Sequence, residues 1–334
     1  MSTDLPVLAE FELIDRIRSR LAHRDDVVLG IGDDGAIVQP PAGQQLVIAM
    51  DTLNSGVHFP HATPVDAIGW KALAVNLSDL AAMGAQPAWC TLSLSLPQAD
   101  AAWMDAFLDG FLALARMHDV ALIGGDTTRG PLSISVAVHG FVRRDAALRR
   151  AAARPGDEVW VSGTLGDAAG ALALLGATPL EPAASAPTGD AATLGELQVR
   201  LDRPTPRVAL GRELAALAHA CIDVSDGLLA DLAHIACASA VAIEIELSAL
   251  PASDALRATF DSERVSELQA TGGDDYELCF TAPAANAERI AQLAASCDVR
   301  LTRIGRVEAG AGVRAVDAAG RVWEPARTGY AHFA

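Results

Sequence analysis

Apolar residues recur along the chain with two periods, and the period separates expected helices from expected strands. Spacings of three and four residues predict helices over Phe11–Leu21 and Ala101–His118. Another helix is expected from Pro64 to Gly84, with Thr63 as N-cap, because proline suits the first turn of a helix. Alternating or short continuous apolar runs predict ten strands. These are Val27–Ile31, Leu46–Ala49, Thr91–Leu96, Val120–Ile123, Leu132–Val142, Val159–Ser162, Cys221–Val224, Val241–Leu247, Glu277–Thr281 and Val299–Ile304. Strands alternate with helices, so the expected class is α/β or α+β.

The length of 334 residues predicts two domains, since single cores rarely grow that large. The turn-forming run Arg154-Pro155-Gly156-Asp157 gives the boundary, with domains at 1–153 and 154–334. Within the second, Ala183–Ala192 is expected to be a loop of small residues.

Charge and composition exclude several classes of partner. The formal net charge is −17, which disfavours nucleic acids and anionic membranes. Lys71 is the only lysine, so no Walker-type lysine is present. The five cysteines form no C-x-x-C pair. The segment Met1–Glu10 lacks the apolar core of a signal peptide. No apolar run approaches the roughly 20 residues that span a bilayer. We therefore expect a reduced, cytoplasmic protein.

Aspartates gather where apolar runs stop, in most cases beside glycine or serine. Single aspartates of this kind are usually turn residues or helix N-caps. Six such segments favour a shared site, since strand ends in α/β sheets are where ligands bind. The segments are Gly30–Asp34, Ala49–Thr52, Asn76–Asp79, Gly124–Thr128, Ile222–Gly227 and Gly272–Tyr276.

Converging carboxylates indicate a bound cation. Two of them ~4 Å apart repel by about 4 kcal/mol at an effective dielectric of 20, which folding does not tolerate unaided. Oxygen ligands without a His/Cys cluster favour Mg²⁺ over zinc. Because Mg²⁺ commonly bridges carboxylates to phosphates, the pattern suggests phosphoryl transfer from a nucleotide such as ATP.

The same segments resemble the thiamine-monophosphate kinase family in order and spacing. The run Ile31–Asp34 by itself would indicate only the wider superfamily of aminoimidazole-ribonucleotide synthetase, selenophosphate synthetase and the hydrogenase-maturation dehydratase. The matching runs are Ile31–Asp34, Lys71–Ala85, Leu122–Leu132, Ile222–Leu228, Gly272–Phe280 and Gly329–Phe333.

The resemblance implies a two-domain aminoimidazole-ribonucleotide synthetase-like fold whose N-terminal sheet pairs across a homodimer. It implies transfer of the γ-phosphoryl of ATP to thiamine monophosphate, assisted by several Mg²⁺ ions and without a covalent enzyme intermediate. The implied metal ligands are Asp34, Asp51, Asp79, Asp126, Asp223 and Asp226. The implied ATP contacts are Gly125, Asp126, Arg150 and Ser225, and the implied substrate contacts are His58, Asp274 and Arg327.

Several of these residues have simpler interpretations that stay open. His58 would cap a loop, Arg150 would belong to a solvated arginine run, and Ser225 would cap the helix after Gly227. The turn Gly163–Asp167 would cradle a phosphate, although a packing role between strand and helix is favoured. Asp33 is expected to be a turn residue, or a residue that supports Asp34 without itself binding the metal.

Three positions depart from the family pattern and bear on the metal and acceptor sides of the site. Ala49-Met50 stands where the family usually has Ser/Thr-Thr, Asp274 where it has Glu, and Arg327 where an aromatic residue is common. The alternatives to this function are a selenophosphate synthetase-like enzyme, whose Cys/Sec–Lys pair is absent from residues 1–33, and a non-enzymatic acidic metal-binding protein.

Overall fold

The computed structural model describes residues 10–177 and 190–331. The chain divides into two compact units, residues 1–80 with 85–145 and residues 81–84 with 146–334. The expected loop at 183–192 lies mainly outside the described residues, and its last two residues open a helix instead. Met1–Ala9 and the motif residues His332 and Phe333 also lie outside them.

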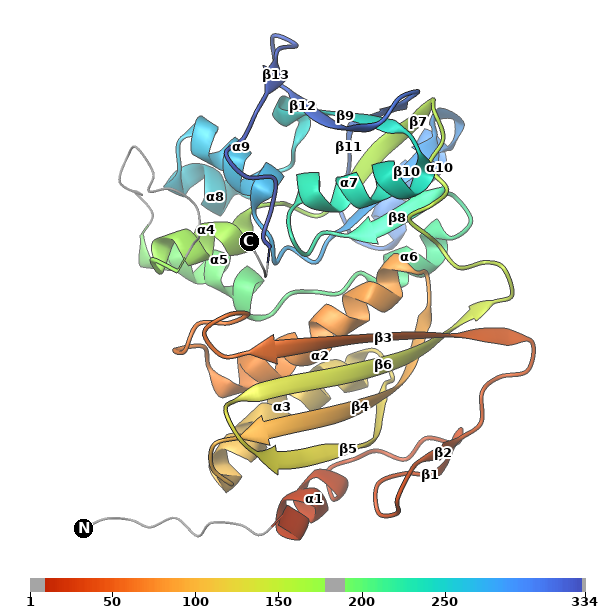
Figure 1. The fold of residues 1–334 in the computed structure, drawn as a ribbon, viewed down its shortest axis with the longest axis vertical. Coiled ribbons are helices and arrows are strands. Elements are labelled where there is room, and N and C mark those ends of the chain that lie inside the picture. The colour runs from red at the N-terminus through yellow and green to blue at the C-terminus, as the bar shows by residue number, and fades with distance from the viewer. Residues whose placement is uncertain (1–9, 178–189, 332–334) are drawn as a thin grey trace. The chain divides into compact units, whose positions relative to one another are not determined.

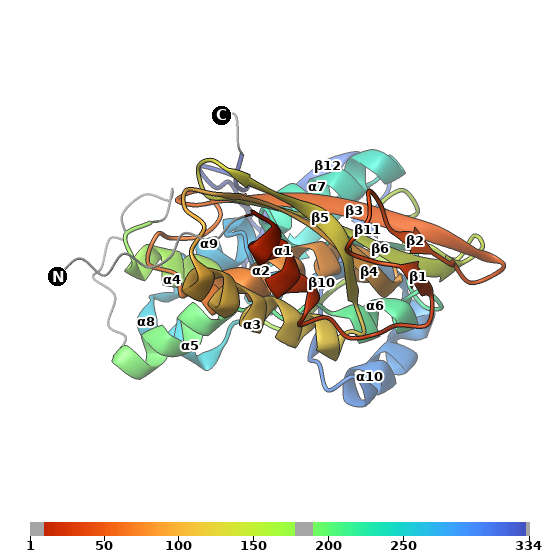
Figure 2. The same ribbon diagram turned by 90° about the horizontal axis from the view of Figure 1, so that it is seen from below.

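The first unit is a four-stranded sheet with two long helices on one face (Figures 1 and 2). Its strands are β3 (Gln44–Asn54), β4 (Gln86–Leu96), β5 (Ala121–Arg129) and β6 (Ser133–Arg143), in the order β3-β6-β4-β5. The helices on that face are α2 (Val65–Ala82) and α3 (Ala101–Met117). A short helix α1 (Glu10–Arg18) and the hairpin β1 (Val27–Leu29) and β2 (Ile37–Val38) precede them.

Alternation along the strands determines which side chains face the helices. On β6, Ile134, Val136 and Val138 are fully buried, whereas Ser135 and Ala137 between them are only partly covered. This period of two is that of a strand with one face in the core. α2 is apolar on nearly all sides, which is typical of a helix enclosed by its neighbours.

The opposite face of this sheet keeps apolar side chains exposed. Ile48 and Met50 of β3 are 61% and 65% exposed, and Leu46 of the same row is 44% exposed. Hairpin β1–β2 covers only one end of this face, where Trp89 packs edge-on against Phe141 at 5.0 Å. The row Leu46, Ile48 and Met50 lies outside that covered end.

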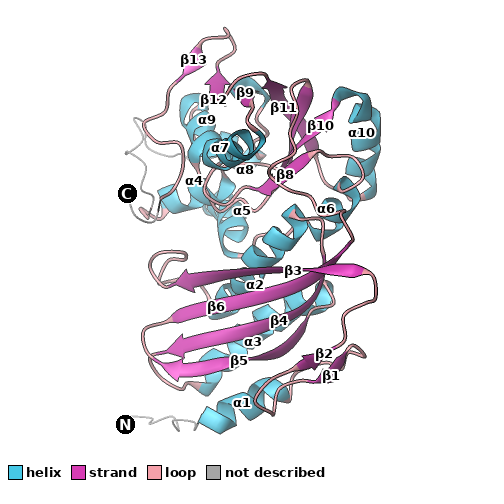
Figure 3. Cartoon of the chain, turned by 45° about the vertical axis from the view of Figure 1, so that its right-hand side comes forward, coloured by secondary structure: helices cyan, strands magenta, loops and turns pink. Residues whose placement is uncertain are grey.

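The second unit is a seven-stranded mixed sheet with helices packed around it (Figure 3). The strand order is β13-β12-β9-β11-β7-β10-β8, and β9–β12 is its parallel pair. The strands are β7 (Asp157–Ser162), β8 (Ala220–Asp223), β9 (Ala242–Glu246), β10 (Leu278–Pro283), β11 (Leu301–Glu308), β12 (Gly312–Val316) and β13 (Val322–Trp323). The α-helices are α4 (Asp167–Leu174), α5 (Ala191–Asp202), α6 (Val208–Leu214), α7 (Leu228–Ser239), α8 (Asp254–Thr259), α9 (Ser262–Thr271) and α10 (Ala287–Ser296).

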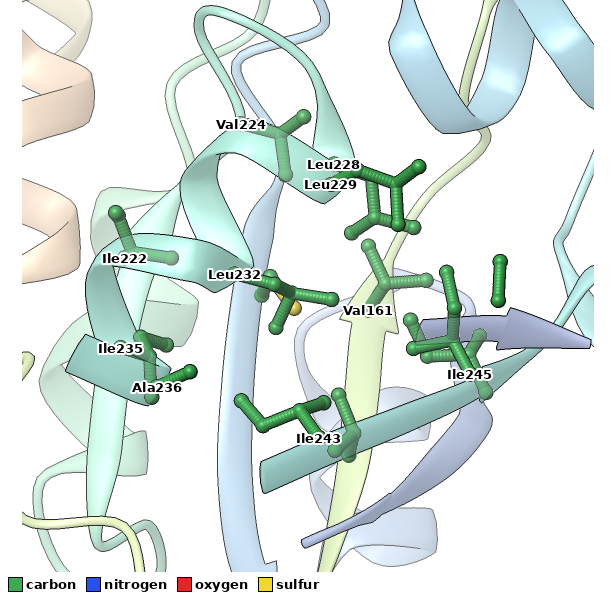
Figure 4. Packing of buried hydrophobic residues seen from close by; sticks show 14 of the residues in the cluster. Val161, Ile222, Val224, Leu228, Leu229, Leu232, Ile235, Ala236, Ile243 and Ile245 are labelled. Atoms are coloured by element: carbon green, nitrogen blue, oxygen red, sulfur yellow. The ribbon is translucent and has the colours of Figure 1, made fainter. Parts of the chain in front are cut away.

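The main core of this unit lies between α7 and the sheet (Figure 4). Leu232 and Ile235 of α7 pack with Val161, Ile243 and Ile245 of the strands, and all five side chains are at most 1% exposed. A second apolar cluster joins α4, α5, α8 and α9. Within the described ranges, every helix is too short or too polar to cross a lipid bilayer.

Most expected elements are present, but several strands run further than the apolar pattern predicted, and two of them run through aspartates of the motifs. β3 continues through Asp51 to Asn54, and β5 continues through Asp126 to Arg129. The expectation that these two aspartates lie where strands stop is therefore wrong. Their polar residues stay in the ladder because both aspartates are exposed, Asp126 on the open face of the sheet and Asp51 on the other face, so neither carboxylate is taken out of water.

Candidate active site

The loop between β8 and α7 carries three of the implied site residues and is joined to a second loop by backbone hydrogen bonds. Beyond the β8–β10 pairing, Val224 N–H donates to Glu277 O at 2.8 Å and Tyr276 N–H donates to Val224 O at 2.8 Å. Asp274 N–H then donates to Ser225 O at 2.9 Å. The ladder thus continues past the strands and holds the segments 223–227 and 272–277 together.

Three carboxylates of this loop and helix are close neighbours. Asp223 and Asp231 are 4% and 3% exposed, and Asp226 is half-buried. Burial, followed by the charges of Asp223 and Asp226, raises the pKa of Asp231 to about 7. Concentrated negative charge of this kind is stabilised by a cation.

This donor set fits Mg²⁺ better than a metal enclosed wholly by protein. Across the described part of the chain, no group of three or more His, Cys, Asp or Glu side chains is arranged to hold a metal ion unaided. Mg²⁺ usually keeps several waters and takes one or two carboxylates together with phosphate oxygens. Asp223 and Asp226 supply such a pair.

Glu277, which directly follows the 272–276 segment, is the centre of a buried charge network. Its carboxylate is fully buried and accepts from Ser162 Oγ at 2.5 Å, Arg200 Nη2 at 2.7 Å and Arg207 Nε at 2.6 Å. Burial by itself would raise the pKa of Glu277, but Arg207 and Arg200 outweigh burial and hold that pKa below its usual range. The network ties β10 to β7 and α5.

In the turn at 163–167, three backbone donors are bonded within the protein. Gly163 N–H donates to Arg300 O at 2.8 Å and Leu165 N–H to Pro251 O at 2.9 Å. Gly166 N–H donates to the buried carboxylate of Asp275, whose pKa is raised chiefly by burial. These bonds support the packing interpretation of the turn over the phosphate cradle.

A cavity of about 340 Å³ lies beside this turn within the second unit. Arg200 and Arg207 in its wall are paired with Glu277, and the hydroxyls of Thr164 and Ser253 donate to Asp167. Its lining residues are Gly163, Thr164, Asp167, Glu196, Leu197, Arg200, Arg207, Ser253, Ala255 and Arg300. The two arginine charges in its wall are therefore balanced by the carboxylate of Glu277.

In the first unit, Asp51 is placed by a contact with α2. Its backbone N–H donates to Asn76 Oδ1 at 2.8 Å, and Asn76 is fully buried. Asp79 follows Asn76 by three residues, so it lies on the same stripe of the helix. Asp51 and Asp79 thus belong to one region of this unit, where β3 meets α2.

Asp126 faces the other way from Asp51. Strand register aligns Asp126 of β5 with Ser93 of β4, Ser135 of β6 and Thr52 of β3. Aligned residues share a face, so Asp51, one residue before Thr52, points to the opposite face. Two strands lie between them, a separation of roughly 14 Å at ~4.8 Å per strand. The sheet of one chain therefore does not bring Asp51 and Asp126 together.

Asp34 and His58 lie in loops of the same unit. Asp34 is exposed, and its N–H donates to Asp33 Oδ1 at 2.9 Å, so Asp33 acts as the expected turn residue. His58 Nδ1 accepts from Asn54 N–H at 2.9 Å, which fixes this ring against the end of β3. The interpretation of His58 as a loop-capping residue is confirmed, because its Nδ1 caps the backbone N–H of Asn54.

The chain matches two families of known proteins that together cover most of it. Residues 32–142 match the family described as AIR synthase related protein, N-terminal domain, and residues 154–318 match its C-terminal domain. The thiamine-monophosphate kinase of Escherichia coli K12 is 47% identical over 305 residues, covering 90% of each chain. A crystal structure of thiamine-monophosphate kinase from Stenotrophomonas maltophilia K279a superposes with a TM-score of 0.84 at 58% identity and covers 93% of this chain and 97% of that one.

The chain belongs to the thiamine-monophosphate kinase family. A further solved structure, described as AaThiL complexed with AMPPCP and TMP, is 34% identical with a TM-score of 0.74 and covers 99% of this chain and 100% of that one. The two-domain architecture expected from the resemblance is confirmed.

Four residues that the kinase family resemblance implies lie on or beside the loops of the second unit. Arg150 is exposed, and its carbonyl accepts from Ser239 Oγ at 2.8 Å. Arg327 is exposed in the C-terminal tail, where Tyr330 N–H donates to Asp226 O at 2.9 Å. Asp274 adopts a positive φ of 67° and accepts from the Tyr276 hydroxyl at 3.0 Å.

The fourth is Ser225, and its capping interpretation is wrong. The N-cap of α7 is Gly227, and no side chain supplies the cap hydrogen bond there. Ser225 is engaged through its backbone instead, because its N–H donates to Asp231 Oδ2 at 3.0 Å.

Sequence reasoning about the kinase motifs missed the acids that support these loops. Asp231, Asp275 and Glu277 are all at most 3% exposed and bonded to backbone or arginine donors. The signal for Asp231 was present, since it is the one acidic residue in the apolar run Leu228–Ala233. A charged residue amid apolar helix positions indicates a buried, partnered group.

Proposed function

We propose that this chain transfers the γ-phosphoryl group of ATP to the phosphate of thiamine monophosphate, giving thiamine diphosphate and ADP. The observation that carries the proposal is the similarity, over 99% of the chain, to the structure described as complexed with AMPPCP and TMP. AMPPCP carries a methylene in place of the oxygen between its β- and γ-phosphorus atoms. That pair of ligands therefore represents the donor and the acceptor of one phosphoryl transfer.

We propose that several Mg²⁺ ions are held by the six aspartates of the motifs. The cluster of Asp223, Asp226 and Asp231 supports this assignment, because its negative charge and oxygen donors suit a hard cation. Bound Mg²⁺ would neutralise the reacting phosphates and reduce their mutual repulsion. The ligand set is Asp34, Asp51, Asp79, Asp126, Asp223 and Asp226.

The chain's own residues position the two substrates. Gly125, Asp126, Arg150 and Ser225 contact ATP in this proposal, and a guanidinium such as that of Arg150 matches phosphate oxygens in shape and charge. His58, Asp274 and Arg327 contact thiamine monophosphate. The acceptor phosphate is already anionic, so it needs alignment rather than a strong general base. The backbone bond from Asp274 to Ser225 O couples the acceptor loop to the nucleotide loop.

We further propose a homodimer in the cytoplasm. Domain 1–153 would supply the dimer contact and most of the metal and nucleotide residues, and a second α/β domain at 154–334 would supply Asp223, Ser225 and Asp226. The exposed apolar row Leu46, Ile48 and Met50 supports pairing of two N-terminal sheets. A second sheet would also supply the missing neighbour for Asp126, which lies apart from Asp51 within one chain. All five cysteines are free thiols, which suits a reducing compartment.

The direct test is turnover by purified protein with ATP, MgCl₂ and thiamine monophosphate, with the diphosphate product separated by chromatography. We expect stoichiometric ADP and thiamine diphosphate, loss of turnover in excess EDTA, and recovery on adding Mg²⁺. Full activity in chelator would overturn the metal assignment. Turnover with selenide in place of thiamine monophosphate would favour the selenophosphate synthetase-like alternative. A protein that binds Mg²⁺ without any heat stabilisation by Mg·ATP would instead be a simple metal binder.

A further inference from the structure

One carboxylate oxygen accepts from three consecutive backbone amides in the loop between β8 and α7. Asp231 Oδ2 lies 3.0 Å from Ser225 N, 3.2 Å from Asp226 N and 3.2 Å from Gly227 N. Asp231 is in the first turn of α7 and is 3% exposed. Its side chain therefore turns back over the start of its own helix and gathers the N–H groups of the preceding loop.

The carbonyl side of the same loop is held by other segments. Tyr276 N–H donates to Val224 O, Asp274 N–H donates to Ser225 O, and Tyr330 N–H donates to Asp226 O. The N–H side has Asp231 Oδ2 as the common acceptor for residues 225, 226 and 227. Loss of that oxygen would leave the three amides without this partner in a largely buried place, and buried backbone donors are rarely left unpaired.

The surroundings leave the loop little room to find another conformation that satisfies these amides. Gly227 has φ 124°, and a Cβ there would lie 2.7 Å from Thr271 O. A Cβ on Gly273 would lie 2.4 Å from Ser225 O, so the two loops touch through backbone alone. The loop is packed closely on the side of its carbonyl groups. On the side of its N–H groups, the backbone conformation depends on the position of Asp231 Oδ2.

We propose that Asp231 is a positioning residue for the phosphoryl-transfer site. Its Oδ2 fixes the amides of residues 225–227, and this orients Ser225 and Asp226 towards the nucleotide and metal site, beside Asp223 at the end of β8. The inference rests on the proposed function for what the loop binds. The requirement is for an acceptor atom at that place, because one oxygen lies within hydrogen-bond distance of all three amides.

The test compares Asp231→Ala, which removes the acceptor, with Asp231→Asn, which keeps a carbonyl oxygen and removes the charge. Asp100→Ala is the matched control, since Asp100 caps α3 through two backbone amides at 2.8 and 3.2 Å. The readouts are hydrogen exchange of the peptide over residues 222–232 and the affinity for Mn²⁺·ATP measured by electron paramagnetic resonance. Neither readout needs an acceptor substrate.

For Asp231→Ala, we expect amide exchange over 225–227 to rise by at least about tenfold and Mn²⁺·ATP affinity to fall by about as much. Asp231→Asn should stay within about threefold of the wild type on both readouts, as should Asp100→Ala. Unchanged loop exchange or unchanged affinity in Asp231→Ala would overturn the proposal. Equal losses in Asp231→Asn and Asp231→Ala would also overturn it, because the charge would then be the essential property.

If Asp231→Ala does not fold, Asp231→Glu answers the same question, since it keeps the charge and displaces the oxygen by one methylene. The proposal expects faster exchange over 225–227 in that variant, and wild-type protection would contradict it. The proposed function fails separately, through absent turnover of thiamine monophosphate by the wild type. Absent turnover would not change the results expected for hydrogen exchange and for Mn²⁺·ATP affinity, because neither measurement needs thiamine monophosphate.

Discussion

Asp51 and Asp126 lie in one sheet but on its two faces, and this arrangement gives each a different environment. Asp51 is anchored through its backbone by the buried amide of Asn76. Asp126 is exposed in a row that also holds Ser93, Ser135 and Thr52. A carboxylate on an open face contributes little to folding, so its substitution reports mainly on ligand binding and turnover.

The first prediction concerns Asp126. Asp126→Asn keeps the shape and removes the charge, so kcat should fall by at least about 100-fold, or ~2.7 kcal/mol of barrier. The melting temperature should barely change. Asp25→Asn, which alters a fully exposed aspartate of the same unit, is the control and should match the wild type in steady-state assays. A loss smaller than about tenfold in Asp126→Asn would remove this residue from the set of essential metal ligands.

The second prediction concerns Asp274, where the family usually has glutamate. Its position is fixed by a bond from its N–H to Ser225 O and by the Tyr276 hydroxyl. Asp274→Glu should change the KM for thiamine monophosphate several-fold, because the carboxylate moves by one methylene, and should leave the KM for ATP nearly unchanged.

Asp274→Ala should weaken the acceptor further, since it removes the negative partner of a cationic thiazolium ring. The control is Asp261→Ala, an N-cap change on α9 that should affect stability alone. Equal effects of Asp274→Glu on both substrates, or a lower melting temperature as its only effect, would show that Asp274 merely shapes the turn.

At the scale of elements, Glu277 joins parts of the second unit that are distant in sequence. Through its carboxylate, β10 is bonded to Ser162 at the end of β7, to Arg200 of α5 and to Arg207 just before α6. Two arginines are thus held beside a fully buried acid. Removing the charge of one partner in such a network leaves the others uncompensated.

The third prediction follows from that network. Glu277→Gln should lower the free energy of unfolding at pH 7 by about 3–5 kcal/mol. The pKa of Glu277 is lower in the folded protein than in the unfolded chain. Its contribution is therefore complete above the unfolded pKa of about 4.3 and is lost as the pH falls through the folded value.

Urea unfolding of the wild type and Glu277→Gln between pH 3 and 7 checks this expectation. The difference between the two proteins should be largest at neutral pH and should shrink in acid. Glu196→Gln, at an exposed position in the wall of the same cavity, should stay within about 0.5 kcal/mol of the wild type. A difference between wild type and Glu277→Gln that is independent of pH would mean that the ion pairs contribute nothing beyond packing.

At the scale of the whole molecule, net charge and exposed apolar surface act in opposite directions on assembly. A formal charge of −17 opposes association of two copies, whereas the row Leu46, Ile48 and Met50 favours it. The apolar row is confined to the face of the first sheet that α2 and α3 leave open. Association through this face would bury the row while most of the charge stays in solvent.

The fourth prediction tests the proposed dimer. Ile48→Asp places a charge in the middle of the open face, and a buried unpaired charge is costly, so the variant should be a monomer of 34.6 kDa at micromolar concentration. The wild type should show twice that mass by light scattering. Val322→Asp changes an equally exposed aliphatic residue of β13 and should remain dimeric. A wild type that is itself monomeric at this concentration would contradict the proposal.

The periodicity of apolar residues determined where most of the helices and strands lie along the chain. It placed the helices at Ala101–Met117 and Val65–Ala82 and the strands at Ser133–Arg143 and Asp157–Ser162 to within a few residues. It ended β3 and β5 too early, because the polar and glycine residues in the later part of each strand lack the apolar pattern of a strand core. The ordered Asp-rich motifs determined the family, since their spacing along the chain needs no tertiary information.

Only the tertiary structure decided how the motif residues are grouped and held. That Asp51 and Asp126 face apart follows from register across four strands, which depends on hydrogen bonds between segments up to about 80 residues apart. The motifs gave no role to Asp231 or Glu277, although Glu277 lies within the matching run Gly272–Phe280, and their roles arise from which amides and arginines the fold places against them. A sequence fixes which side chains are available, whereas burial and partners, which set their chemistry, come from contacts that are distant along the chain.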